Sequence, residues 1–218
     1  MVSSPSDMYQ WSDLASVPPR PGIYAWYYAV ELSEYDLNKV ISDIRRQRDD
    51  NSEYAKKTLV AFLEEFVFRS FSEEPYSASL KGALKPTYEG KVVHKPVVSE
   101  TLLDRIIERP SRLRMLSSVL RHAIPEFASP IYIGMTKNLR ARILKHRDLI
   151  DELRALQSKT TREAADKQDQ TFALRVVQRG MDLDGLRVAV RLFSEEEGQY
   201  LDAENVLNRI NFPILGRN

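Results

Sequence analysis

Alternating apolar positions mark three short strands along this chain. The predicted strands are 22–30 (GIYAWYYAV), 129–134 (SPIYIG) and 186–193 (LRVAVRLF). Each is rich in aromatic or β-branched residues, and turn-forming residues such as PPRPG precede the first. Period-two alternation places Tyr24 on the same face of its strand as the residues at 22 and 26, with 23, 25 and 27 opposite.

Apolar residues at three- and four-residue spacing predict helices over most of the remaining chain. The predicted helices cover residues 34–48, 53–71, 99–108, 111–123, 138–156, 161–180 and 195–210. Ser99 and Ser111 are expected to cap the starts of two of them, and Gly180 is expected to end another. Glycines and prolines between 75 and 98 predict an irregular or hairpin-like stretch.

The helix predicted at 138–156 carries two polar residues on its apolar side. That side is formed by Leu139, Ile143, Ile150 and Leu153, and Arg142 and His146 fall within it, four residues apart. Burying a cation costs several kcal/mol unless the cation is paired. The pattern therefore indicates either an arginine paired with a buried carboxylate beside a core histidine, or a polar site facing the sheet.

The last predicted helix has a similar arrangement. Its apolar side is formed by Tyr200, Ala203, Val206, Leu207 and Ile210, and Glu204 lies on the edge of that side. A glutamate in such a place is most often solvated. Together with an inward arginine and histidine from another helix, it predicts a small polar site on the face of a three-stranded sheet.

Composition narrows the class of protein. The 218 residues are 43% hydrophobic and 29% charged, with no cysteine. This is a globular composition, and it excludes a disulfide framework, a thiolate metal site and a cysteine nucleophile. No apolar run approaches the roughly 20 residues that span a bilayer, and the first residues, MVSSPSDMYQWSD, lack the pattern of a signal peptide. We therefore expect a cytoplasmic protein with no membrane partner.

Positive charge is concentrated in the middle of the chain. Residues 105–147 carry ten Lys or Arg against two acidic residues, which makes this segment +8 and the rest −7 within a net charge of +1. A basic block can contact phosphates, although solvated helix faces would give the same pattern. We assign substrate contacts to five of its cations: Lys137, Arg140, Lys145, Arg112 and Arg114.

Four motifs in order resemble the GIY-YIG nuclease family. They are GIY at 22–24, YIG at 132–134, the run TKNLRARILKH at 136–146, and a late helix with DAEN around Glu204. Each motif alone is unspecific, whereas four in the same order are specific. The resemblance covers about 22–28 and 129–218, roughly half of the chain.

The resemblance implies a set of site residues. Tyr24 and Tyr132 match the two motif tyrosines, Arg142 and His146 match the active-site residues of the helix, and Glu204 matches the carboxylate that binds the metal. The family uses one divalent cation, so Mg²⁺ or Mn²⁺ is the expected cofactor. Arg142 would stabilise charge on the phosphate, and Tyr132 would relay a proton, with Tyr24 or His146 positioning it. Family members usually carry a later asparagine, which we assign to Asn218 rather than to Asn211.

The spacing of the motifs predicts the organisation of the chain. The two motif tyrosines, Tyr24 and Tyr132, stand 108 positions apart, where many family members have about ten residues between their motifs. We expect an α/β (α+β) fold in which 1–30 and 129–218 form a small three-stranded antiparallel sheet flanked by helices. Residues 31–128 would be a mostly helical insertion that contacts DNA, a partner or a second copy.

These observations predict a metal-dependent DNA endonuclease that works in restriction, phage defence or mobile-element biology. A homodimer or a subunit of a defence complex suits a chain of this size. Arg112 and Arg114 of the insertion would grip DNA, or their region would form a lid or a dimer surface. Two alternatives are a degenerate module that only binds nucleic acid or a partner, and a nuclease that cleaves RNA.

Overall fold

The chain divides into two compact units in a computed structural model. The structure describes residues 7–73, 75–83, 86–93, 96–157, 172–193 and 200–216. Residues 1–31 and 116–218 form one unit, here called the core unit, and Leu32–Met115 form the other, here called the insertion unit. The second boundary, after Met115, falls inside helix α4 (Arg112–Phe127), 13 residues before the expected boundary after 128.

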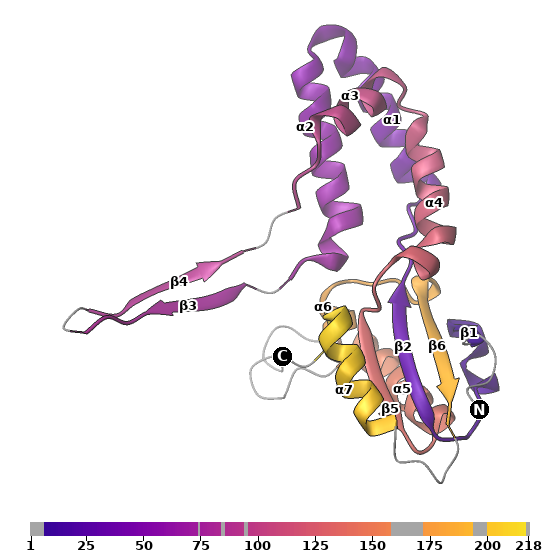
Figure 1. Cartoon of the computed structure of the whole chain (residues 1–218). Helices are drawn as coiled ribbons and strands as arrows, with labels where there is room; N and C mark the ends of the chain where they lie inside the picture. Colours follow the sequence, from indigo (N-terminus) through magenta and orange to yellow (C-terminus); the bar gives the residue numbers. More distant parts are fainter. Residues whose placement is uncertain are drawn as a thin grey trace. The chain divides into compact units, whose positions relative to one another are not determined.

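The core unit is built on a four-stranded antiparallel sheet with the order β1-β6-β2-β5 (Figure 1). Its strands are β1 (Asp7–Gln10), β2 (Gly22–Tyr28), β5 (Tyr132–Thr136) and β6 (Leu186–Leu192). The mixed helix-and-strand class is confirmed, and the three predicted strands are β2, β5 and β6. The expected count of three strands is wrong, because β1 pairs with the edge of β6. At four largely exposed residues, β1 is too short and too polar to give a periodic signal.

Strand β2, which carries the first motif, lies between strands β5 and β6 in the sheet. Tyr24 is paired with Gly134 of β5 on one side and with Val190 of β6 on the other. Alternation along β2 places Tyr24 and Trp26 on one face, where they are 1% and 0% exposed, and Ile23 on the opposite face. Burial on both faces explains why this strand reads as an almost continuous apolar run.

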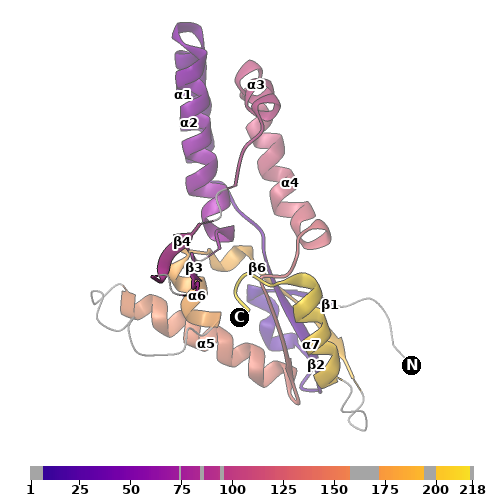
Figure 2. The ribbon, with the colours of Figure 1, turned by 60° about the vertical axis from the view of Figure 1, so that its left-hand side comes forward.

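Helices cover both faces of this sheet. Helix α5 (Leu139–Gln157) lies on one face and α7 (Tyr200–Asn211) on the other, as Figures 1 and 2 show from two directions. The predicted apolar side of α5 is confirmed at Leu139, Ile143 and Ile150, each 0% exposed. These three residues anchor α5 so that Arg142 and His146, on the same side, are held against the sheet.

Helix α6 (Phe172–Gln178) ends as its sequence predicts. Gly180 has φ of +63°, and its N–H donates to Val177 O while that of Met181 donates to Val176 O. This pair of hydrogen bonds is the Schellman arrangement, which favours glycine because its left-handed backbone is strained for other residues. The predicted start of this helix, at 161, lies outside the described residues.

The apolar side predicted for α7 is largely uncovered. Ala203 packs against the sheet beside Ile23 and Ile133, but Val206 and Ile210 are 54% and 67% exposed, and Leu207 is 36% exposed. Among the described side chains of this helix, the apolar side predicted from the sequence is therefore only partly buried.

The insertion unit is mostly helical, as expected, with one added ribbon. Its helices are α1 (Glu34–Asp50), α2 (Ser52–Leu63), which continues through a π-helical turn (Glu64–Phe68) and a 3₁₀ turn (Arg69–Phe71), α3 (Glu100–Glu108) and the start of α4. Ser99 accepts a hydrogen bond from Leu102 N–H and so caps α3, as predicted. The hairpin-like stretch forms strands β3 (Tyr76–Leu80) and β4 (Tyr88–Val92).

The helices of the insertion unit share a small core. Leu37 and Ile44 of α1, Leu59 and Leu63 of α2, and Ile106 of α3 are each at most 2% exposed. Lys56 of α2 forms ion pairs with Glu100 and Asp104, which tie α3 to α2 at the surface. Across the described parts of both units, no helix has the length and apolar character needed to cross a membrane.

Candidate active site

The Tyr24 hydroxyl is the centre of a polar cluster on the α5 face of the sheet. Its oxygen lies 2.9 Å from His146 Nε2 and 3.4 Å from Arg142 Nε. The tyrosine comes from the first motif strand, and the other two residues lie on adjacent turns of α5, four positions apart. The predicted inward position of Arg142 and His146 is therefore confirmed, and the structure shows what they face.

Burial keeps His146 uncharged. The imidazole is 7% exposed, and burial followed by the positive charges of Arg142 and Lys145 lowers its pKa to about 3. At neutral pH the ring is thus a neutral hydrogen-bond partner with one free acceptor nitrogen. Because Arg142 Nε can only donate, the Tyr24 oxygen accepts from it, and the Tyr24 hydroxyl hydrogen can be donated to His146 Nε2.

Tyr24 is held in its protonated form. Burial raises its pKa well above the ordinary tyrosine value, and the nearby Tyr132 raises it further, while the hydrogen bond and positive charge of Arg142 act in the opposite direction. A phenol that stays protonated at all physiological pH values is a poor proton acceptor. Tyr24 is therefore suited to positioning its neighbours, and proton transfer would have to use another group.

Arg142 has a phenol as its partner, where a buried carboxylate was the alternative expectation. It forms no ion pair with a carboxylate within the described parts of the chain. Burial acts to lower its pKa, but hydrogen bonds and electrostatic interaction with Tyr24 and Tyr132 outweigh this and raise it. The guanidinium is half-buried and stays charged, and it has donors left for an anion.

Tyr132 is the more accessible of the two motif tyrosines. Its ring centroid lies 6.1 Å from that of Tyr24 and 5.8 Å from that of His146. The side chain is half-buried, whereas Tyr24 is 1% exposed. The structure therefore brings together Tyr24, Tyr132, Arg142 and His146, four of the six residues predicted to be catalytic, with the Tyr132 side chain partly open to solvent.

The second motif ends in glycine, Gly134, because the Tyr24 ring leaves no room for a side chain there. A Cβ at this position would lie 2.6 Å from both Cζ and Oη of Tyr24, and 3.0 Å from Cε1 of Tyr132. Cross-strand pairing of Tyr24 with Gly134 places the ring directly over the glycine backbone. The absence of a side chain at 134 thus allows the Tyr24 hydroxyl to reach α5, a role that sequence reasoning did not assign.

Phe172 is a second residue of the cluster that the sequence did not indicate. Its ring centroid lies 4.8 Å from that of Tyr132, 5.2 Å from that of His146 and 5.4 Å from that of Trp26. At 3% exposure it forms an apolar wall that removes water from one side of the imidazole. Its only sequence signal is its place on the apolar stripe of FALRVV, which an ordinary core residue shares.

Glu204 comes from the helix on the other face of the sheet. The carboxylate is half-buried, and its Oε1 accepts a hydrogen bond 3.4 Å from Asn208 Nδ2. Its neighbour Ala203 packs on the face of Ile23 and Ile133, while Tyr132 alternates to the α5 face. The assignment of Glu204 as the metal ligand stays a prediction.

The structure describes the assigned cations of the core unit but not the assigned asparagine. Asn218 lies outside the described residues, and Asn211 donates from Nδ2 to Leu207 O on its own helix. Lys137 and Lys145 are exposed, whereas Arg140 is half-buried with its Nε 2.7 Å from Val17 O. Arg140 is thus partly occupied in holding α5 to the segment before β2.

The two cations assigned in the insertion unit differ as well. Arg114 donates to Asn38 Oδ1 and lies 3.7 Å from the Glu34 carboxylate, so it joins α4 to α1 within that unit. Arg112, at the first position of α4, is half-buried. Their contact with DNA stays a prediction, and Arg112 is the better probe because its side chain has no such intramolecular role among the described contacts.

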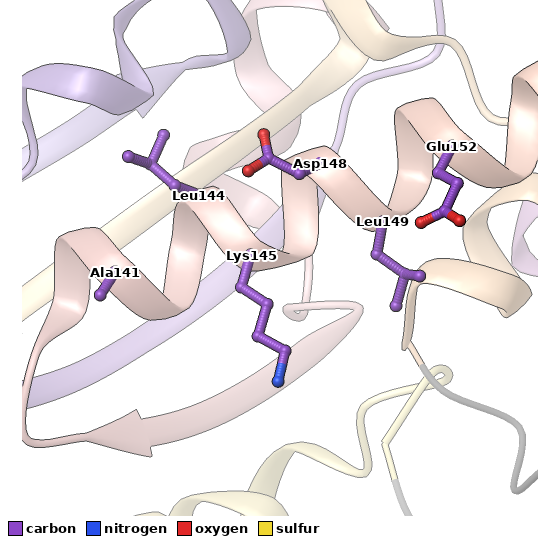
Figure 3. Close-up of a pocket in the computed structure, with 6 residues that line it drawn as sticks. All are labelled: Ala141, Leu144, Lys145, Asp148, Leu149 and Glu152. Atoms are coloured by element: carbon purple, nitrogen blue, oxygen red, sulfur yellow. The ribbon is translucent and has the colours of Figure 1, made fainter.

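A shallow pocket of about 340 Å³ lies along the surface of α5 (Figure 3). It is lined by Ala141, Leu144, Lys145, Asp148, Leu149 and Glu152. Its charged residues are exposed at the surface and carry both signs. Of the residues assigned to the site, Lys145 lines this pocket, whereas Tyr24, Tyr132, Arg142 and His146 do not.

Comparison of the chain with models of protein families, with characterised proteins and with solved structures found no match. The functional assignment therefore depends on the motif residues and on the geometry described above.

Proposed function

We propose that this protein is a divalent-metal-dependent endonuclease that hydrolyses phosphodiester bonds in DNA. The observation that carries the proposal is the position of the Tyr24 hydroxyl, 2.9 Å from His146 Nε2 and 3.4 Å from Arg142 Nε. Tyr24 of the first motif strand thus meets two residues of the helix that follows the second, although Tyr24 and His146 are 122 positions apart in sequence. The ring of Tyr132, from the second motif strand, lies 6.1 Å from that of Tyr24 between centroids. Restriction, phage defence or mobile-element biology remains the setting we propose.

Arg142 is the residue best placed to stabilise the transition state. Its guanidinium is charged, half-buried and oriented by the Tyr24 hydroxyl. Donors that are fixed before the reaction stabilise developing charge on a phosphate without reorganising. Removing one such donor in other enzymes costs about 2.7–4 kcal/mol in the transition state.

Tyr132 is the residue best placed to move a proton. It is the motif tyrosine with solvent access, and it lies within the same aromatic cluster as the neutral His146. Tyr24 and His146 are positioning residues in this scheme, because both are buried and each satisfies the other. A general acid or base contributes about 10²–10⁴-fold when it is held in reach of the reacting group.

The donor chemistry of Glu204 fits a weakly held Mg²⁺ or Mn²⁺. Magnesium is commonly bound by one or two carboxylates together with water and substrate phosphates. Glu204 offers one half-buried carboxylate, and no group of three or more His, Asp or Glu that could hold a metal occurs among the described residues. When bound, the ion would supply positive charge to the phosphate and the leaving oxygen.

Plasmid cleavage in Mg²⁺ or Mn²⁺ tests the proposal, with each variant compared with a matched control. Tyr132→Phe is paired with Tyr27→Phe, Arg142→Gln with Arg147→Gln, and Glu204→Gln with Asp202→Asn; each control changes a residue that lies outside the cluster. We expect cleavage to fall by at least about 100-fold in the first member of each pair and to persist in the second. EDTA should abolish it.

The outcomes separate the alternatives. Undiminished cutting by Glu204→Gln would remove the metal assignment, and undiminished cutting by Arg142→Gln would remove the active-site assignment. If the wild-type protein binds DNA but cuts neither DNA nor RNA with either metal, the binding-module alternative is correct. If only RNA is cut, the substrate class in the proposal is wrong.

A further inference from the structure

The two-stranded ribbon of β3 and β4 has one apolar face, and the large side chains on that face are exposed. The two strands form a two-stranded sheet that no other described strand joins (Figure 1). Cross-strand pairs Tyr76–Val92, Ala78–Gly90 and Leu80–Tyr88 share one face, because they alternate with the pairs Ser77–Lys91 and Ser79–Glu89. The ribbon is therefore apolar on one face and polar on the other.

The large side chains of the apolar face are exposed. Tyr76 is 54% exposed, Leu80 73%, Tyr88 61% and Val92 58%. An isolated two-stranded ribbon is marginally stable in water and normally needs a surface to pack against. An exposed apolar face of this kind marks an interaction site.

The apolar face has a large-small-large profile along the ribbon. Tyr76 and Val92 stand at one end, Leu80 and Tyr88 at the other, and Ala78 and Gly90 between them. A Cβ added at Gly90 would meet no atom within 4 Å, so nothing within the described chain requires glycine there. The resulting saddle is a feature of the surface, and packing within the described structure does not explain it.

We propose that this face is the contact between two copies of the chain, related by a twofold axis at the Ala78–Gly90 pair. A twofold contact pairs a surface with its own copy, so the small residues of the two ribbons meet at the axis and the large apolar ends meet on either side of it. Small residues at the axis let the two ribbons approach to the ordinary spacing of packed sheets, about 10 Å. The large ends of one copy then cover those of the other.

The area of the face agrees with such a contact. Taking roughly 200 Å² for each whole side chain, the four large residues offer about 490 Å² in each copy at their observed exposures. Two copies would bury about 980 Å² from these side chains, and Ala78, Gly90 and the backbone bring the total to about 1,000 Å² or slightly more, near the lower limit for a specific interface.

The charge of the ribbon favours a protein partner over DNA. Residues 76–93 carry three lysines and one glutamate, and none of these lies among the three apolar pairs. Nucleic-acid affinity comes mainly from cations that contact phosphates, whereas the core of a protein interface is depleted in charge and enriched in tyrosine. The apolar face has the second composition.

The absence of cysteine from the whole chain allows a direct test. Ala78→Cys introduces a single thiol at the proposed axis, and Ser77→Cys introduces one on the polar face of the same strand. Each purified full-length variant is treated with a short bis-maleimide and analysed on denaturing gels, and its mass in solution is measured by light scattering. We expect both variants to be dimers and only Ala78→Cys to be cross-linked.

A second variant tests the apolar contact itself. Leu80→Lys with Tyr88→Lys should raise the dissociation constant of the dimer by at least about 30-fold, as loss of large buried interface residues does, while the helical content is retained. A monomeric wild-type protein at all concentrations, or equal cross-linking at positions 77 and 78, overturns the proposal. So does a double-lysine variant that remains dimeric. None of these results depends on nuclease activity.

Discussion

Replacing Gly134 by alanine should displace the Tyr24 ring and so disrupt the tyrosine cluster. The new methyl carbon would lie 2.6 Å from Cζ and Oη of Tyr24, where ordinary contacts begin at 3.4 Å. The Tyr24 ring would have to move by about 0.8 Å, the difference between these two distances. A shift of this size is enough to break the geometry of the hydrogen bond between its hydroxyl and His146 Nε2, which spans 2.9 Å.

The cost has two parts. Overpacking a well-filled site typically destabilises a protein by about 1–3 kcal/mol, and each lost hydrogen bond adds about 1 kcal/mol. We therefore expect Gly134→Ala to lower the free energy of unfolding of the core unit by about 2–4 kcal/mol. At about 3 °C per kcal/mol for a unit of this size, the midpoint should fall by roughly 6–12 °C.

Urea unfolding followed by tryptophan fluorescence measures this cost in the relevant unit. Both tryptophans of the chain, Trp11 and Trp26, belong to the core unit, and Trp26 lies beside Phe172 in the cluster. The transition therefore reports on the part of the protein that contains Gly134. The insertion unit has no tryptophan to obscure it.

A double-mutant cycle with Tyr24→Leu identifies the cause. A leucine side chain ends before the positions of Cζ and Oη, so the two contacts at 2.6 Å disappear. In that background Gly134→Ala should cost less than about 0.5 kcal/mol, which makes the coupling between the sites about 1.5–3.5 kcal/mol. If alanine costs the same in both backgrounds, or costs nothing in the wild type, the proposed role of the glycine is refuted.

Two further predictions concern single residues. His146 has a pKa of about 3 when folded and about 6.5 when unfolded, so the unfolded state binds more protons between these values. The stabilisation is present above pH 6.5 and is lost as the pH falls toward 3, where the free energy of unfolding should change by up to about 1.4 kcal/mol per pH unit. In urea unfolding at a series of pH values, His146→Gln should remove this pH dependence. A substitution of the exposed histidine, His122→Gln, should keep it. Arg112→Glu should weaken DNA binding and reduce its salt dependence by about one counterion. Lys39→Glu, which lies outside the basic block, should change neither. An unchanged affinity for Arg112→Glu would refute the hypothesis that Arg112 contacts DNA.

The sequence by itself determined the local elements. Strands β2, β5 and β6 were predictable because alternation and β-branched residues are local signals, and α5 because its apolar residues recur at helical spacing. The same spacing showed that Arg142 and His146 face inward. The Schellman end of α6 was also predictable, since glycine at 180 follows an apolar helical pattern directly.

Only the tertiary structure decided what these residues meet. The partner of Arg142 is the Tyr24 hydroxyl, 118 positions away in sequence, and no periodicity can distinguish a phenol from a carboxylate as that partner. The roles of Gly134 and Phe172 likewise depend on rings brought over them by strand register and by α6. The pairing of β1 with β6 depends on the sheet having an unpaired edge at β6. The exposure of Val206 and Ile210 depends on how much of α7 the sheet covers. A residue's own pattern shows which way it faces, whereas its neighbours are set by the folding of distant segments.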